Sequence, residues 1–417
     1  KDYNTNYCFL GQYILEKDWD KKVGMVKRSH PNSQQLNNFL RRKLIEANNI
    51  SFQNEEQVST KWMKKRIVGT QNRKSFFLVA AERIEHKYHQ GVFSVAKSEL
   101  SILYNLEEFL NLTKGAGKED VIKSIKKRRN ERISKARRSE FSFMDGLFYF
   151  KKNKTLKFQD INGSFIERYK TFCSAYLGQK TRTITNQLIF IRTLYNIAIK
   201  DGVVAQKYYP FAGDKEKIRL TSGNKVGLSK KEIERIELLE LEPESVIWHT
   251  KNVWLIAFYF AGMRISDILK LKWSDFKDDR LYYIMKKNEK PLSLKIPLKA
   301  KVILQKYEKN KRGNEDYIFP FISNAIPQER EVIYRKIKSS TKQLNKYLKI
   351  IAIECGIEKN LSNHIARHSF GNIAGDKIHP LMLQKLYRHS DLKTTLNYQA
   401  NFIHKDADNA LDSVINF

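Results

Sequence analysis

The sequence predicts a mainly α-helical protein with small β regions, divided over several domains. The chain has 417 residues, which is more than one ordinary domain holds. Long stretches carry apolar residues at intervals of three and four, the spacing that places them on one face of a helix. Short extended segments are predicted in two places, within residues 11–30 and near residues 280–298.

The composition is that of a globular and strongly basic protein. Hydrophobic residues make up 41% and aromatic residues 12% of the chain, enough to bury real cores. The 77 Lys and Arg against 45 Asp and Glu give a formal net charge of +32, and such a charge attracts polyanions. Nucleic acid is therefore the leading partner. A membrane surface is the weaker alternative, because we find no basic amphipathic helix with exposed large apolar residues.

The chain also lacks the marks of a secreted or membrane-spanning protein. No stretch approaches the roughly 18 apolar residues of a membrane span, and no signal peptide precedes Lys1. Because the chain begins without methionine, we expect that its natural N-terminus has been trimmed. Three widely scattered cysteines, Cys8, Cys173 and Cys355, fit a reducing cytosol. We expect a cytoplasmic protein associated with the bacterial nucleoid.

Four segments follow from the patterns along the chain. Residues 1–70 combine extended pieces, a turn and a polar helical stretch, which we interpret as a small module, either complete or truncated. Residues 71–213 are dominated by helical periodicity, and one stripe there predicts a core-facing helix: Ile184, Leu188, Ile191, Leu194 and Ile197. Residues 214–224 lie in a glycine-containing, charged stretch that reads as a linker. A last domain, 225–417, opens on a helix with Ser229 and Glu232 spaced as a capping box.

A dense basic run lies inside the helical region. Positions 123–138 hold nine Lys or Arg and one Glu. Such a run is often only a solvated helix face, but its density in an already basic domain favours contact with nucleic-acid phosphates. Each phosphate neutralised should add about −0.9 to the slope of log affinity against log salt. The predicted contact residues are Lys123, Lys126, Lys127, Arg128, Arg129, Arg132, Lys135, Arg137 and Arg138.

Two tempting motifs are rejected. The stretch KGAGKED at 114–120 lacks the spacing of a phosphate-binding loop and no apolar strand precedes it. His86 and His89 have no further ligands at a workable spacing, so a surface pair is the better interpretation. No carboxylate cluster suggests a magnesium site. We therefore expect neither a metal nor another cofactor, and any phosphate chemistry has to run without them.

Phosphoryl transfer without a metal needs fixed cations, a nucleophile and an acid for the leaving group. Arg264 lies close behind a glycine at the start of an amphipathic helix, with Asp267 one turn on. His364 and Arg367 are three residues apart, on one predicted helix face that follows a Ser/Asn cap. A predicted hairpin carries Lys286 and Lys287, and the segment HSDLKTTLNY adds His389 and Tyr398.

Together these residues carry a family resemblance. The order R…K…H-x-x-R…H…Y, in the segments GMRISDILKLKWSD, HIARHSF and HSDLKTTLNY, resembles the catalytic domain of the tyrosine recombinase (phage integrase) family over residues 225–400. The resemblance implies a mixed α/β catalytic domain. It also implies that 71–213 is a helical core DNA-binding domain and that 1–70 is an arm-binding-like module.

The resemblance assigns a role to each candidate. Tyr398 would attack the scissile phosphate, form a 3′-phosphotyrosine and release a 5′-hydroxyl without any need for ATP. The charge of the transition state would be stabilised by Arg264, Arg367 and His389. His364 would help to move the proton of the nucleophile, Lys287 would protonate the leaving oxygen, and Asp267 would orient the site. Because an unperturbed tyrosine has a pKa near 10, neighbouring cations and His364 must favour the ionised phenol.

Some positions depart from the family pattern or stay open. Ala366 and Arg388 stand where the family usually has Leu and Gly. Arg388 could contact a backbone phosphate or have only a surface role. Lys287 is favoured over Lys286, and His368 is interpreted as structural. The tail carries the apolar stripe Ala407, Ala410, Leu411 and Val414, which either packs on its own domain or, as often in this family, docks on a neighbouring protomer.

The expected function is therefore that of a site-specific DNA recombinase, the integrase of a mobile element such as a phage or a conjugative transposon. The resemblance implies a homotetramer on two double-stranded DNA sites, exchange of strand pairs through a Holliday junction, and accessory DNA-bending proteins. Within the same chemistry, a resolvase or invertase and a type IB topoisomerase are alternatives. From another class, a catalytically silent DNA-binding regulator built on this fold is the alternative.

Overall fold

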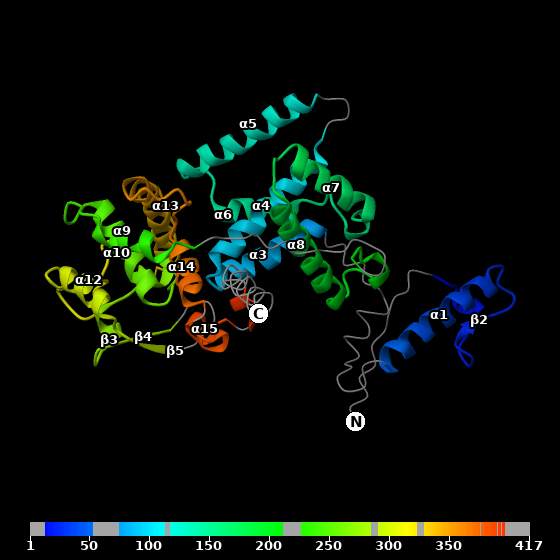
Figure 1. Ribbon diagram of the computed structural model, residues 1–417. Coiled ribbons are helices and arrows are strands. Elements are labelled where there is room, and N and C mark those ends of the chain that lie inside the picture. The colour runs from blue at the N-terminus through cyan, green and yellow to red at the C-terminus, as the bar shows by residue number, and fades with distance from the viewer. Residues whose placement is uncertain are drawn as a thin grey trace, which may run out of the picture. The chain divides into compact units, whose positions relative to one another are not determined.

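The computed structural model describes residues 13–52, 75–112, 117–211, 227–284, 291–322, 329–375, 377–389, 391–392 and 394–396. The chain divides into two compact units, residues 1–221 and 222–417. Both units are mostly helical with small antiparallel sheets (Figure 1), so the predicted fold class is confirmed. No helix in these ranges is long and apolar enough to cross a membrane.

The first described segment is a small hairpin followed by a helix. Strand β1 (Trp19–Asp20) pairs antiparallel with β2 (Met25–Val26) around Gly24, whose φ of +68° suits a residue without a Cβ. Helix α1 (Ser33–Phe52) is attached to this hairpin through Asn37. The Asn37 Oδ1 accepts from the Val26 amide at 2.8 Å, and its Nδ2 donates to the Val26 carbonyl at 2.9 Å. The extended pieces, the turn and the helix predicted here are all present.

The helical region that follows packs around one apolar core. Its helices are α3 (Phe76–His89), α4 (Phe93–Leu110), α5 (Lys118–Arg137), α6 (Phe143–Lys152), α7 (Gly163–Ala175) and α8 (Thr181–Lys200). The stripe predicted on α8 faces this core, with Ile184, Leu188, Ile191 and Leu194 buried and Ile197 partly buried against it. Helix α5 differs, since only its Ile125 is buried and it lies at the margin of this helical group (Figure 1).

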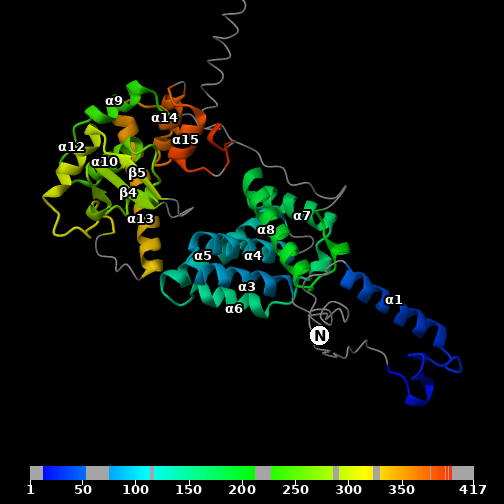
Figure 2. The ribbon, with the colours of Figure 1, turned by 90° about the horizontal axis from the view of Figure 1, so that it is seen from below.

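The second unit is built around helix α10, most of whose residues are buried. Its elements are α9 (Lys230–Leu238), α10 (Val246–Tyr259), α11 (Ile265–Ile268), β3 (Phe276–Lys277), β4 (Arg280–Ile284), β5 (Pro291–Lys295), α12 (Leu298–Glu308), α13 (Arg330–Glu354), α14 (Ile365–Ala374) and α15 (Pro380–Tyr387). Helices α12, α13 and α14 pack against α10 (Figure 2). The sheet has the antiparallel order β3-β4-β5. Short 3-10 turns occur at Glu16–Asp18, Phe158–Asp160, Gln206–Tyr208 and Trp273–Asp275.

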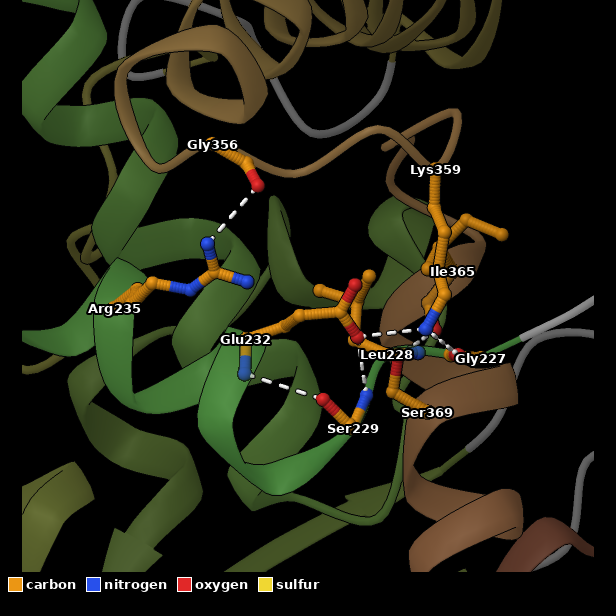
Figure 3. A network of polar contacts seen from close by, with 9 residues as sticks. All are labelled: Gly227, Leu228, Ser229, Glu232, Arg235, Gly356, Lys359, Ile365 and Ser369. Carbon is orange, nitrogen blue, oxygen red and sulfur yellow. Dashed lines mark hydrogen bonds and ion pairs between the residues drawn. The ribbon is translucent and has the colours of Figure 1, made fainter.

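The start of this unit is fastened to α14. The predicted capping box is present: Ser229 Oγ accepts from the Glu232 amide at 3.3 Å, and Glu232 Oε2 accepts from the Ser229 amide at 2.7 Å. Lys359 Nζ also donates to Glu232 Oε2, at 2.7 Å (Figure 3). The Leu228 amide donates to Ser369 Oγ at 2.8 Å. A Cβ on Gly227 would lie 2.7 Å from the His368 carbonyl carbon, so this backbone rests directly on the helix that carries Arg367.

Candidate active site

Arg367 is the centre of the candidate site. It lies on α14, its side chain is buried (residue 3% exposed), and its guanidinium is held from several sides. Nη1 donates to the Gly262 carbonyl at 3.1 Å, and Nη2 donates to the Tyr387 carbonyl at 2.8 Å. Nη2 also lies 3.0 Å from His389 Nε2. The structure therefore brings together two of the predicted site residues, Arg367 and His389, from α14 and from the segment after α15.

The contact with Arg367 fixes the tautomer of His389. A guanidinium can only donate hydrogen bonds, so His389 Nε2 must accept and the ring proton must sit on Nδ1. Nδ1 lies 3.0 Å from Thr395 Oγ1, to which it therefore donates. The sequence analysis missed Thr395, which is fully buried. A threonine six residues after a histidine carries no signal of its own, because the contact depends on how the chain turns after α15.

Arg264 stands on the loop that touches Arg367. It occupies the N-cap of α11 in an extended conformation. Gly262, two residues before it, has a φ of +67°, and a Cβ there would lie 2.5 Å from the Arg367 Cα. Glycine is therefore required twice, for the left-handed backbone and for the close approach. As a result, the loop that carries Arg264 and the helix that carries Arg367 are in direct backbone contact.

Asp267 lies on α11, directly after this loop, and is buried. Burial raises the pKa of its carboxyl, while the positive charge of Arg264 opposes that rise. Ser266 Oγ donates to Asp267 Oδ1 at 3.4 Å. The charge of Asp267 thus interacts with that of Arg264.

His364 does not lie within the helix, behind a Ser/Asn cap, as the sequence analysis expected. It is itself the N-cap of α14 and is exposed, whereas Arg367 is buried. The predicted Ser/Asn cap is wrong, because no side chain in the described part of the chain caps α14. The side-chain amide of Asn363 is instead bound to α13, where its Nδ2 donates to Asn345 Oδ1 at 2.9 Å. The ring of His364 meets that of His368 edge-on, with centroids 4.9 Å apart.

Arg388 is buried, so the interpretation as a surface residue is wrong. It is 4% exposed and has the left-handed backbone, with a φ of 53°, that glycine adopts without cost. Its guanidinium lies 4.3 Å from the centroid of the Tyr283 ring, and Nη2 donates to the Tyr283 carbonyl at 3.2 Å. Tyr283 belongs to β4, so Arg388 joins the His389 segment to the sheet.

Several predicted features lie outside the described residues. These are Lys286, Lys287, Tyr398 and the apolar stripe of the tail, Ala407, Ala410, Leu411 and Val414.

The basic run on α5 divides into two sets. Arg128 Nε donates to Glu108 Oε2 at 2.9 Å, Arg129 Nη2 donates to Asn105 Oδ1 at 2.8 Å, and Arg132 lies 4.1 Å from the centroid of the Tyr104 ring. These three arginines attach α5 to α4. The other six predicted contact residues are exposed: Lys123, Lys126, Lys127, Lys135, Arg137 and Arg138. Arg138 also forms an ion pair with Glu140 at 2.6 Å.

A second basic surface, on α13, was missed by the sequence analysis. Exposed cations recur along one face of this helix at intervals of three and four residues: Arg335, Lys338, Lys342, Lys346 and Lys349. Ile333, Leu344 and Leu348 lie buried on the opposite face. The signal was present in the spacing of the lysines, but it is more diffuse than the run on α5. We call these five residues the α13 stripe.

Comparison with known proteins finds three family models along the chain. The phage integrase family matches residues 228–404, the phage integrase SAM-like domain matches 119–218, and the Arm DNA-binding domain matches 1–64.

The curated relatives are tyrosine recombinases. The tyrosine recombinase XerC of Xanthomonas axonopodis pv. citri is 25% identical over 168 residues, which is 40% of this chain and 51% of that protein. A XerC-like tyrosine recombinase of Caldanaerobacter subterraneus is 24% identical over 266 residues, 57% of this chain and 66% of that protein. The chain thus spans about half the length of the first of these relatives.

Among solved structures, the XerH site-specific recombinase bound to its palindromic difH substrate has a TM-score of 0.49 at 16% identity, covering 80% of this chain and 95% of that one. The Tn1549 transposon integrase in complex with transposon right end DNA has a TM-score of 0.43 at 17% identity, covering 62% and 86%. On the three family matches and the curated relatives, the chain belongs to the phage integrase family of tyrosine recombinases.

Proposed function

We propose that this protein is a site-specific DNA recombinase that cuts and rejoins DNA through a 3′-phosphotyrosine on Tyr398. The observation that carries the proposal is the arrangement around Arg367. A buried guanidinium is hydrogen-bonded to His389 and lies against the loop of Arg264. Preorganised cations of this kind stabilise the charge that develops on a phosphate in the transition state.

The proposal assigns a residue to each step of cleavage and rejoining. The Tyr398 oxygen forms a bond to phosphorus as its proton passes toward His364, and the bond from phosphorus to the 5′-oxygen breaks. Lys287, or Lys286 in its place, donates a proton to that oxygen. Rejoining reverses these steps with a 5′-hydroxyl from another strand, so the phosphodiester energy is kept in the covalent intermediate. Arg264 and Arg367 bind the non-bridging oxygens, His389 acts with them by holding the Arg367 guanidinium, and Asp267 holds Arg264 in place.

The same proposal includes the biological setting. The match of residues 1–64 to an Arm DNA-binding domain supports the integrase of a mobile element over a resolvase or invertase. We propose that a homotetramer acts on two duplex sites, assisted by DNA-bending proteins. The exposed cations of α5 and the α13 stripe would contact the DNA phosphates.

Covalent trapping tests the proposal. The protein and its Tyr398→Phe variant are incubated with fragmented host and element DNA, denatured without proteolysis, and the attached DNA is sequenced. We expect the wild type to hold specific fragments that the variant does not hold, which also identifies the site. If both proteins bind DNA tightly but trap equally little, the recombinase proposal fails and a silent DNA-binding regulator takes its place.

A further inference from the structure

We infer that Tyr387 is a positioning residue that holds the Arg367 guanidinium for strand cleavage. This inference rests on the proposed function and deepens it, because it names what fixes the central cation. Tyr387 is the last residue of α15 and is fully buried. The sequence analysis gave it no role.

Three parts of Tyr387 contact Arg367. The Tyr387 carbonyl accepts from Arg367 Nη2 at 2.8 Å. Its ring lies under the guanidinium, with Cζ 3.8 Å from the ring centroid. Its hydroxyl donates to the main-chain carbonyl of Arg367 at 2.5 Å. One residue therefore holds both ends of Arg367, the backbone on α14 and the charged group at the tip.

The chemistry of these contacts suits a cation that has to act on a phosphate. A carboxylate would hold Arg367 more strongly, but it would also cancel the charge that the phosphate requires. The Tyr387 carbonyl, the aromatic face and the neutral His389 ring carry no net charge. The face of a tyrosine ring attracts a cation through its quadrupole. Arg367 is thus fixed in position while its positive charge stays available.

Tyr387 also influences His389. The two rings meet edge-on, with centroids 5.3 Å apart and an interplanar angle of 77°. His389 in turn accepts from Arg367 Nη2, so Arg367, Tyr387 and His389 form one contiguous group. A displacement of the Tyr387 ring would remove one contact from the guanidinium and one from the imidazole at the same time.

Tyr387 could instead be only a core residue, since its ring also lies 6.2 Å from that of Phe370. The two roles differ in their dependence on the charge of the phosphate. A merely structural residue affects cleavage of any substrate equally. A residue that positions a cation matters less when the scissile group carries no negative charge.

The test compares two substrates. Duplex DNA carrying the site found by trapping is prepared with a normal scissile phosphate or with a neutral methylphosphonate there, and covalent cleavage is followed in a single turnover. With the phosphodiester we expect Tyr387→Leu to slow cleavage by about tenfold and Tyr387→Phe, which keeps the ring, by about threefold. With the methylphosphonate both defects should shrink to less than about twofold.

A second buried tyrosine provides the matched control. Tyr307 lies in the same unit, and its hydroxyl is 2.8 Å from His249 Nδ1. Tyr307→Phe should leave the ratio of the two cleavage rates unchanged. If Tyr387→Leu does not fold, as judged by thermal unfolding, the Phe variant decides the question in the same assay.

The outcomes separate the inference from the proposed function. If the wild type cleaves and the Tyr387 variants match it, or are slowed equally on both substrates, the inference is overturned and the proposed function stands. If the wild type forms no covalent complex with either substrate, both are overturned.

Discussion

The cations of helices α14 and α13 have opposite surroundings. Arg367 on α14 is buried and held by carbonyls, an imidazole and an aromatic ring. The five residues of the α13 stripe are exposed along a helix face. A buried, fixed cation acts on one atom at short range and is little affected by salt. Exposed cations on flexible stems attract an extended anion, and salt weakens that attraction. Under the proposed function, Arg367 on α14 would serve the chemistry and the α13 stripe would supply DNA affinity.

Helix α5 combines the two arrangements. Its arginines at 128, 129 and 132 are held by side chains of α4, while the lysines at 123, 126 and 127 are exposed. Here Arg128 and Arg132 share the carboxylate of Glu108, so part of their charge is compensated. Burial alone does not make a cation a catalytic candidate, because the charge of its partners decides whether it stays available.

The largest effect that the comparison predicts is on Arg367. Arg367→Lys keeps the charge but loses the planar fork of donors, so we expect the cleavage rate to fall by about 10²–10³-fold. DNA affinity should change by less than about twofold, because Lys keeps the charge and the scissile phosphate is only one of the phosphates that the DNA presents. Single-turnover cleavage and equilibrium binding at one salt concentration measure both quantities. A loss of affinity with an unchanged cleavage rate would contradict the assignment.

The next effect concerns the loop that rests on Arg367. Gly262→Ala adds a Cβ 2.5 Å from the Arg367 Cα at a φ of +67°. We expect a loss of about 2–4 kcal/mol in the free energy of unfolding, measured by urea denaturation. Gly356→Ala is the control, since its φ is +59° but the nearest atom is the tip of the Arg235 side chain, at 3.2 Å, rather than backbone. That variant should lose only about 1 kcal/mol from backbone strain. Equal losses would show that the close approach does not matter.

The fold class could be predicted because it depends on local patterns. The α8 stripe follows from helical periodicity, and the capping box at Ser229 follows from spacing alone. Thr395 and Tyr387 could not be predicted. Their contacts join segments whose approach depends on the turn after α15 and on the packing of α15 against α14. Arg388 was ambiguous for the same reason, because its burial depends on the distant strand β4.

A smaller effect is on the salt dependence of DNA binding, which distinguishes exposed cations from cations held by other side chains. Replacing Lys338, Lys342 and Lys346 with Gln should make the slope of log affinity against log salt shallower by about 2.7, if each contacts one phosphate. Arg128→Gln on α5 should leave that slope nearly unchanged and lower the thermal stability instead, since it loses the contact with Glu108. Binding titrations over a salt series measure the slope. A shallower slope for Arg128→Gln would show that the α4 contact opens on DNA.

The smallest effect concerns the ion pair between Lys359 and Glu232, which lies on neither α13 nor α14. Here a cation is paired directly with a carboxylate. Burial acts to raise the pKa of Glu232, but hydrogen bonds from Lys359 and Ser229 outweigh it, so the net shift is downward. A carboxyl whose pKa is lower in the folded than in the unfolded state adds stability above its unfolded pKa and loses it as the pH falls through the folded value.

Glu232→Gln retains a side chain suited to the capping box but loses the charge. It should therefore lower the free energy of unfolding by about 0.5–1 kcal/mol at pH 7. The difference from wild type should shrink as the pH falls below the ordinary glutamate pKa of about 4.3 and vanish once the carboxyl is protonated in the folded protein. Urea denaturation of both proteins across that range measures the difference. A gap that stays constant with pH would mean that the Lys359 contact contributes through its geometry rather than its charge. That result would weaken the contrast between cations paired with a carboxylate and cations held by uncharged groups. It would mean that the charge of Glu232 does not offset the charge of Lys359.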